Sequence, residues 1–247
     1  MRRLLQKVYG VYALAAMATV VAVAGAALVI LAPTLSLRRT FGRWGSRAIL
    51  SAAFVPFRVR GLEHLPPGPC VVVSNHASYL DGPILTAALP HRFTFVVQDG
   101  AGNWPFIGLV IRRMGVTFIN RGSVKEAARQ TRALIRRLEE GASLVIFVEG
   151  TFERAPGLLP FRNGAFLMAA HAKVPVVPVV LRGTRHLYGE GQVLPRHSSV
   201  EIEVLAPIEP SGAHDEVHSL RDRARAAILA RCGEPDLKSA PAVPAHG

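Results

Sequence analysis

The sequence predicts an α/β domain, with a mixed β-sheet flanked by helices, that follows an N-terminal membrane helix. Two observations lead to this fold class: short β-branched runs alternate with helix-length segments from residue 59 onward, and residues 8–32 form one long apolar segment. Of the 247 residues, 50% are hydrophobic, which is ample for a core. We therefore expect a membrane anchor over residues 1–58, a folded domain over 59–232 and a disordered tail over 233–247.

The apolar segment carries no formal charge from residue 8 to residue 32. At about 1.5 Å per residue it would extend roughly 37 Å, which exceeds a hydrocarbon core of about 30 Å. Basic residues before the segment and small residues around Gly25 also fit a cleaved signal peptide. We expect a retained helix, transmembrane or deeply embedded, because the apolar run is long for a signal peptide and continues past Gly25. The excess of basic residues after Pro33 places the following domain in the cytoplasm.

Residues 35–57 predict a basic amphipathic helix. Arg39, Arg43 and Arg47 recur every four residues, while apolar side chains fall on another face. Such a helix is suited to an anionic lipid surface, where phosphate head groups would be the counter-charge. An ordinary surface helix is the alternative.

The rest of the chain alternates between strand and helix patterns. Strands are expected at residues 69–73, 93–97, 116–119, 144–148, 174–180 and 199–205. Helices are expected at residues 82–89, within 103–114, from Ser123 to 140 and at 214–231. Ser123 and Glu126 form a capping box for the long helix. The prolines in 174–180 favour a packed or edge strand that shapes a groove.

The seven residues 75–81, NHASYLD, come directly after the first apolar strand. On a continuous helix His76 and Asp81 would lie roughly 140° apart, so they can meet only if a loop turns between them. Asp81 is also a good N-cap for the next helix, with Pro83 in its first turn. A carboxylate that bonds one imidazole nitrogen fixes the tautomer and leaves the other nitrogen free as a general base. Taken alone, the motif is better explained by a helix cap beside a loop histidine, because the pattern is short and common by chance.

Three further blocks accompany that motif: GVTFINR at 115–121, FVEGT at 147–151 and VPVVPV at 174–179. In this order and spacing, the four blocks resemble the 1-acylglycerol-3-phosphate acyltransferase family, part of the wider glycerolipid acyltransferase group. The resemblance covers about residues 60 to 208 and implies the glycerolipid acyltransferase fold.

The resemblance also implies a reaction. His76, oriented by Asp81, would take the proton from the free hydroxyl of a lysophospholipid as that oxygen attacks an acyl thioester. The first acceptor to expect is 1-acyl-sn-glycerol-3-phosphate, and the product phosphatidic acid. Acyl-CoA or acyl carrier protein would be the co-substrate, with no cofactor or metal. Substrate binding would fall to Asn75, Ser78, Arg121, Glu149, Gly150 and Thr151.

Three departures from the family pattern bear on the acceptor. Val148 replaces a proline, Phe152 and Glu153 replace an Arg-Ser pair, and Gln98 stands where many members carry lysine. One expected phosphate ligand is therefore missing, for which Arg154 or Arg162 could substitute. Another lysophospholipid or an amino-lipid hydroxyl stays open as the acceptor.

The formal net charge of +12 calls for an anionic partner. Nucleic acid is one candidate, but the sequence holds no nucleic-acid-binding motif, and the apolar segment favours a lipid bilayer. Cys70 and Cys232 provide no disulfide framework, and no residue cluster has the spacing of a metal site.

Two other functions remain possible at this point. A membrane-bound ester or thioester hydrolase could use Ser78, His76 and Asp81, although no Gly-x-Ser-x-Gly motif surrounds Ser78. A noncatalytic membrane-binding protein would need only the basic helix.

Overall fold

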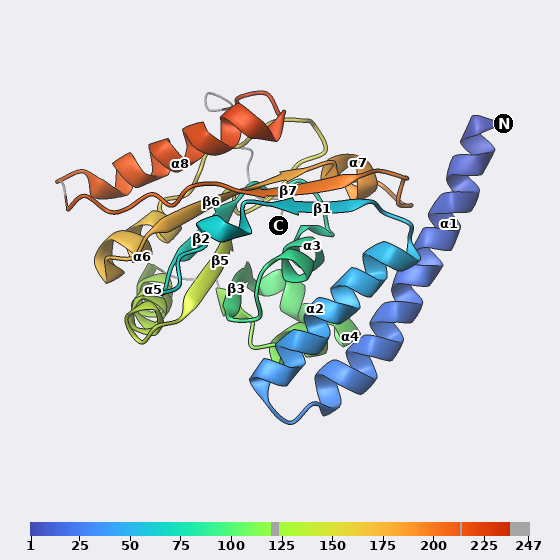
Figure 1. The fold of residues 1–247 in the computed structure, drawn as a ribbon, viewed down its shortest axis with the longest axis horizontal. Helices are drawn as coiled ribbons and strands as arrows, with labels where there is room; N and C mark the ends of the chain where they lie inside the picture. The colour runs from blue at the N-terminus through green and yellow to red at the C-terminus, as the bar shows by residue number, and fades with distance from the viewer. Residues whose placement is uncertain (120–123, 213, 238–247) are drawn as a thin grey trace.

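A computed structural model of the chain describes residues 1–119, 124–212 and 214–237. Within these residues, seven strands form one sheet in the order β1-β7-β6-β2-β5-β3-β4 (Figure 1). In chain order the strands are β1 (Phe57–Arg60), β2 (Val71–Ser74), β3 (Phe93–Gln98), β4 (Thr117–Ile119), β5 (Ser143–Phe147), β6 (Val176–Arg182) and β7 (Val200–Val204).

The sheet is mixed, as the sequence predicts. Strands β6, β2, β5, β3 and β4 are parallel to one another, whereas β7 runs antiparallel to β6 and β1 pairs in parallel with β7. Strand β1 is not among the strands expected from the sequence, since its only partner in the sheet is the distant β7. Strand β6 is packed in the centre of the sheet, so the edge position that its prolines also allowed is wrong.

Helices cover both faces of the sheet and create two separate cores (Figure 1). Beyond the N-terminal segment they are α3 (Asp81–Ala88), α4 (Pro105–Arg113), α5 (Val124–Glu139), α6 (Gly164–Ala172), α7 (Thr184–Tyr188) and α8 (Glu216–Cys232). Strand β2 shows the alternation between faces: Val72 belongs to the core on the α3 side, while Val71 and Val73 belong to the core under α6 and α8. Cys70 is fully buried, as expected for a core residue.

The N-terminal segment folds back on itself. Helix α1 (Arg2–Val20) continues as the π-helix η1 (Val21–Ile30), and α2 (Leu35–Ala52) returns beside it (Figure 1). By length and composition, the helical stretch Arg2–Ala26 could cross a membrane. The Tyr9 hydroxyl donates to the Ala53 carbonyl at 2.8 Å, which joins α1 to the end of α2.

Three arginines of α2, Arg39, Arg43 and Arg47, contact the folded domain, so the expectation that they meet lipid head groups is wrong. Arg47 Nε donates to the Ala87 carbonyl at 2.9 Å, and Arg43 Nη2 donates to the Ala88 carbonyl at 3.2 Å. Arg39 Nη2 reaches a side chain of β3 at 2.7 Å. The last carbonyls of a helix lack partners within it and carry partial negative charge, so the end of α3 attracts Arg43 and Arg47.

Candidate active site

The site lies where β2 and β5 end. The two strands are parallel and pair Ser74 with Phe147, so the residues that follow each strand emerge at the same edge of the sheet. His76 comes two residues after β2, and Glu149 comes two residues after β5. This edge is where an open α/β sheet commonly binds its ligand.

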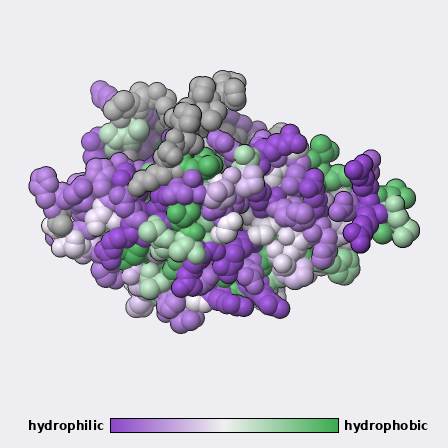
Figure 2. Space-filling model, turned by 90° about the horizontal axis from the view of Figure 1, so that it is seen from above, coloured by the Kyte–Doolittle hydropathy of each residue, from purple (hydrophilic) through white to green (hydrophobic). Residues whose placement is uncertain are grey.

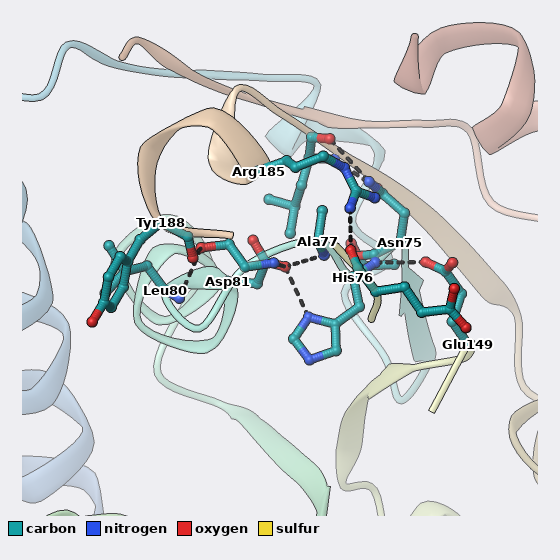
Figure 3. A network of polar contacts seen from close by, with 12 residues as sticks. Asn75, His76, Ala77, Leu80, Asp81, Glu149, Arg185 and Tyr188 are labelled. Atoms are coloured by element: carbon teal, nitrogen blue, oxygen red, sulfur yellow. Dashed lines mark hydrogen bonds and ion pairs between the residues drawn. The ribbon is translucent and has the colours of Figure 1, made fainter. Parts of the chain in front are cut away.

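The structure brings His76 and Asp81 together. His76 Nδ1 lies 2.8 Å from Asp81 Oδ2, and the Asp81 side chain is fully buried whereas 19% of the His76 side chain is exposed (Figure 3). A carboxylate can only accept, so Nδ1 is a donor here, and in the neutral ring the unprotonated nitrogen is Nε2. The loop between them makes the turn that a helix could not.

Asp81 does not cap the helix that it begins, which corrects the sequence expectation. Its Oδ2 atom instead accepts the backbone N–H of Ala77 at 2.7 Å and of Ser78 at 2.9 Å (Figure 3). The other oxygen, Oδ1, is buried and has no hydrogen-bond partner among the described residues. One oxygen therefore holds both the histidine and the turn that carries it.

Glu149 holds the same turn from the β5 side. Its Oε1 accepts the backbone N–H of His76 at 2.7 Å (Figure 3). Its Oε2 accepts the backbone N–H of Leu159 at 2.7 Å. The residue is 3% exposed, and burial raises the pKa of its carboxyl to about 7, against the opposing effect of these two hydrogen bonds and of the nearby Arg185 charge. Glu149 was predicted to bind substrate, but both of its oxygens are engaged with the backbone.

Asn75 and Ser78 are also committed to backbone contacts. The Asn75 amide donates to the Leu181 carbonyl at 3.0 Å and accepts the Leu181 N–H at 2.9 Å, which extends the pairing of β2 with β6 by one residue. Ser78 Oγ donates to the Tyr188 carbonyl at 2.8 Å, and the side chain is fully buried. Both residues hold the loop in place, and a buried Ser78 bonded to the backbone is poorly placed as a hydrolase nucleophile.

The remaining predicted residues lie around the turn after β5. Gly150 has φ +72°, a left-handed conformation that glycine adopts without strain, and its N–H donates to the Phe147 carbonyl at 3.1 Å. Thr151 follows it and is exposed. Arg162 Nε donates to the Glu149 carbonyl at 3.2 Å, so Arg162 adjoins this turn. Arg121 lies outside the described residues.

Aromatic rings enclose the imidazole, a feature that the sequence reasoning missed. The Phe147 ring stacks on the His76 ring with centroids 4.2 Å apart, and the Phe152 ring lies 4.4 Å away on a tilt. Tyr79 packs on Phe152 at 5.0 Å. The only sequence signal was that Phe152 departs from the family pattern.

The geometry supports general base chemistry. A neutral imidazole with a free Nε2, partly exposed and held by a buried carboxylate, can accept a proton from a hydroxyl group. Among the described residues, no group of three or more His, Cys, Asp or Glu side chains is arranged to hold a metal ion.

Comparison with known proteins matches the family model "Acyltransferase" to residues 56–182, a range that contains the His76–Asp81 pair and the Glu149 turn. The chain is 34% identical to a chloroplast 1-acyl-sn-glycerol-3-phosphate acyltransferase of Brassica napus over 71% of its length, and 33% identical to the human alpha enzyme of that name over 69%. These alignments cover 53% and 62% of the two relatives, so the chain spans about half to three-fifths of their length.

A lyso-ornithine lipid O-acyltransferase from Pseudomonas aeruginosa is 31% identical over 80% of both chains. The solved structure of the 1-acyl-sn-glycerophosphate acyltransferase PlsC from Thermotoga maritima superimposes with a TM-score of 0.73, covers 94% of this chain and 99% of that one, and is 23% identical. That likeness shows the fold. From the match to the family model and the identity to these relatives, the chain belongs to the acyltransferase family.

Proposed function

We propose that this protein transfers a fatty acyl group from an acyl thioester to the hydroxyl of a lysolipid, with 1-acyl-sn-glycerol-3-phosphate as the first acceptor and phosphatidic acid as its product. The observation that carries the proposal is the 2.8 Å contact between His76 and the buried Asp81, at the end of a parallel strand. The plant and human relatives named above are 1-acyl-sn-glycerol-3-phosphate acyltransferases, which supports this acceptor.

The reaction then proceeds by direct transfer. His76 Nε2 accepts the hydroxyl proton as the acceptor oxygen forms a bond to the thioester carbonyl carbon. The carbon–sulfur bond breaks, and the imidazolium returns its proton to the departing thiolate. The Asp81 carboxylate stabilises the imidazolium while it exists, as a buried anion at hydrogen-bond distance. The acyl donor is acyl-CoA or an acylated acyl carrier protein.

Two rings govern access to the imidazole. Phe147 and Phe152 both pack against His76, so they limit the directions from which water can approach Nε2. A shielded base favours transfer to a bound lipid hydroxyl over hydrolysis of the thioester. This arrangement fits a transferase better than a hydrolase.

A lyso-ornithine lipid is the second candidate acceptor. Phe152 stands where the family pattern has an arginine, and in this structure its ring packs on His76 and Tyr79. An aromatic ring provides no charge for a phosphate, so an acceptor that lacks a phosphate suits this position. The Pseudomonas aeruginosa relative, which acts on such an acceptor by its name, aligns over 80% of both chains.

The N-terminal hairpin is proposed to hold the protein at a membrane. Exposed apolar side chains gather on α1, α2 and α4: Leu4, Leu5, Val8, Val11, Trp44, Trp104, Phe106, Ile107 and Leu109. Figure 2 shows hydrophobic residues at the end of the molecule where α1 lies. This apolar surface would enter the bilayer.

The packing of α1 and η1 favours embedding over crossing. A Cβ atom at Gly10 would meet Leu194 at 2.8 Å, and one at Gly25 would meet Val110 at 3.3 Å, so both ends of the segment contact the folded domain. A helix that crossed the bilayer would lose these contacts. We propose that the catalytic domain faces the cytoplasm, the side favoured by the basic residues after Pro33.

The test is acyl transfer by protein purified in detergent. The donors are labelled acyl-CoA and acyl carrier protein loaded with the labelled acyl group. Each donor is offered with 1-acyl-sn-glycerol-3-phosphate, with lyso-ornithine lipid, with other lysophospholipids and without any acceptor. We expect His76→Ala to lower the transfer rate roughly 10²- to 10⁴-fold, about 3 to 5 kcal/mol of barrier, because it removes the base. His171→Ala, an exposed histidine on α6, is the matched control and should leave the rate unchanged. Near-normal turnover by folded His76→Ala would overturn the mechanism, and cleavage without an acceptor would indicate a hydrolase.

A further inference from the structure

A large cleft lies between the start of α1 and the loop that follows α7. Its volume is about 850 Å³, and it is lined by the first turns of α1, Arg154, Pro156, the start of α7, the loop 189–196 and residues 232–234. A cleft of this size lies within the range of about 300 to 1,000 Å³ that small-molecule and cofactor sites occupy. Figure 1 shows the N-terminal half of α1 running beside α7.

The cleft is strongly cationic. Its lining includes Arg3, Lys7, Arg154, Arg185 and Arg196, against two carboxylates. One of these carboxylates, Glu234, accepts from Arg185 Nε at 2.7 Å, and the other, Glu190, accepts the Tyr79 hydroxyl at 2.6 Å.

The other four cations have no carboxylate partner among the described residues. Arg3, Lys7, Arg154 and Arg196 are all exposed, and they come from three separate parts of the chain. Cations gathered around a concave surface focus their field into it and raise the local concentration of anions. The chemistry of the cleft therefore selects a ligand with several negative charges.

A chain of aromatic contacts connects the cleft to the active site. Glu190, in the wall of the cleft, bonds the Tyr79 hydroxyl. The Tyr79 ring packs on Phe152 with centroids 5.0 Å apart, and Phe152 packs on His76 at 4.4 Å. Two aromatic rings thus separate the cleft wall from the base. A ligand anchored in the cleft would need a long flexible arm to bring a reactive group across these rings.

We propose that this cleft binds the phosphate groups of a coenzyme A thioester, with its pantetheine arm extending over Tyr79 and Phe152 toward His76. The inference rests on the proposed function and names the donor that the function left open. A concave site of nucleotide size favours a small phosphate-bearing molecule over a folded carrier protein. Helix α1 would then do more than contact the membrane, because Arg3 and Lys7 would hold the donor.

The experiment compares donors that carry progressively fewer phosphates. Initial rates are measured with acyl-CoA, acyl-dephospho-CoA, which lacks the 3′-phosphate, and acyl-pantetheine, which has no phosphate. The variant is Lys7→Ala with Arg196→Ala, two exposed cations of the cleft lining. The matched control is Arg132→Ala with Arg136→Ala, two exposed arginines of α5 that do not line the cleft. All four positions are exposed, so folding should be preserved.

We expect the cleft variant to raise KM for acyl-CoA about tenfold or more, since each charge-assisted bond to phosphate contributes on this scale. The kcat and the KM for the lysolipid should not change. With acyl-pantetheine, the variant and the wild type should have the same KM. As ionic strength increases, the KM for acyl-CoA should also rise more steeply for the wild type than for the variant.

Several results would overturn the inference. An unchanged KM for acyl-CoA would do so, as would an equal loss with acyl-pantetheine, which indicates a structural defect. An acylated carrier protein is offered as a fourth donor, and a KM raised for it alone would assign the cleft to that protein. Weaker binding to phosphatidylglycerol vesicles with an unchanged KM would assign it to lipid phosphate.

Binding of free coenzyme A, measured by equilibrium dialysis in detergent, separates this inference from the proposed function. If coenzyme A binds and the cleft variant weakens it, the inference stands even when no acceptor in the panel is acylated. If wild type transfers acyl groups from acyl-CoA but coenzyme A binding does not depend on the cleft cations, the function stands and the inference fails.

Discussion

Replacing Asp81 by asparagine should separate the charge of this residue from its shape. In the structure, Asp81 Oδ2 accepts three hydrogen bonds, from His76 Nδ1 at 2.8 Å and from the N–H groups of Ala77 and Ser78 at 2.7 and 2.9 Å. Oδ1 has no partner within the described residues. The asparagine amide can therefore place its oxygen at the Oδ2 position, where the two backbone donors hold it, and its NH₂ at the Oδ1 position. His76 Nδ1 still donates, so the tautomer is preserved.

The loss of activity in Asp81→Asn then measures what the negative charge of Asp81 contributes to catalysis. The neutral amide no longer stabilises the imidazolium that forms in the transition state, and we expect the transfer rate to fall roughly 10²- to 10³-fold, about 3 to 4 kcal/mol of barrier. Stability should fall less, by about 1 to 3 kcal/mol, because the buried NH₂ gains no acceptor. Asp81→Ala is different, since it leaves three donors without an acceptor and should cost roughly 3 to 6 kcal/mol of folding free energy.

The assay is the initial rate of acyl transfer, paired with urea unfolding in the same detergent, for Asp81→Asn and Asp81→Ala. Asp215→Asn, whose side chain is 75% exposed beside α8, is the control for an acid-to-amide change. The reasoning is refuted if Asp81→Asn keeps its rate within about threefold of wild type. It is also refuted if Asp81→Asn unfolds as readily as Asp81→Ala.

Three further predictions concern neighbouring residues. Burial raises the Glu149 pKa from 4.5 to about 7, so the folded state keeps a proton that the unfolded state has released, and stability should fall as pH rises through this window. The free energy of unfolding should fall by roughly 3 kcal/mol between pH 4.5 and 7, as measured by urea unfolding. Glu149→Gln should remove most of this pH dependence. A variant with the same pH dependence as wild type would contradict the prediction. Asn75→Ala leaves the N–H and carbonyl of Leu181 unpaired and should destabilise the fold by about 2 to 4 kcal/mol in the same assay, so a change below about 0.5 kcal/mol would speak against it. Phe152→Arg restores a cation beside His76 and should raise kcat/KM for 1-acyl-sn-glycerol-3-phosphate relative to lyso-ornithine lipid about tenfold, and an unchanged ratio would show that residue 152 does not select the acceptor.

Much of the fold and part of the site could be predicted from the sequence because the signals are local. The alternation of apolar runs with amphipathic segments predicted six of the seven strands in the described residues, and the charge-free stretch predicted the long N-terminal helix. The pairing of His76 with Asp81 was also predicted, because the four motif blocks resemble the acyltransferase family, and it joins residues only five positions apart. These features depend on neighbours along the chain.

Only the tertiary structure decided what each polar side chain faces. The periodic arginines of α2 could have met lipid or protein, and they meet protein: Arg43 and Arg47 contact the carbonyl end of α3, and Arg39 contacts β3. Glu149 and His76 are 73 residues apart, and Asn75 and Leu181 are 106 apart. Periodicity determines which side of a helix or strand is polar. The partner that each polar side chain contacts is determined by how distant elements pack. For the same reason, Phe152 could be recognised in the sequence as an unusual residue, whereas its contact with the His76 ring required the folded chain.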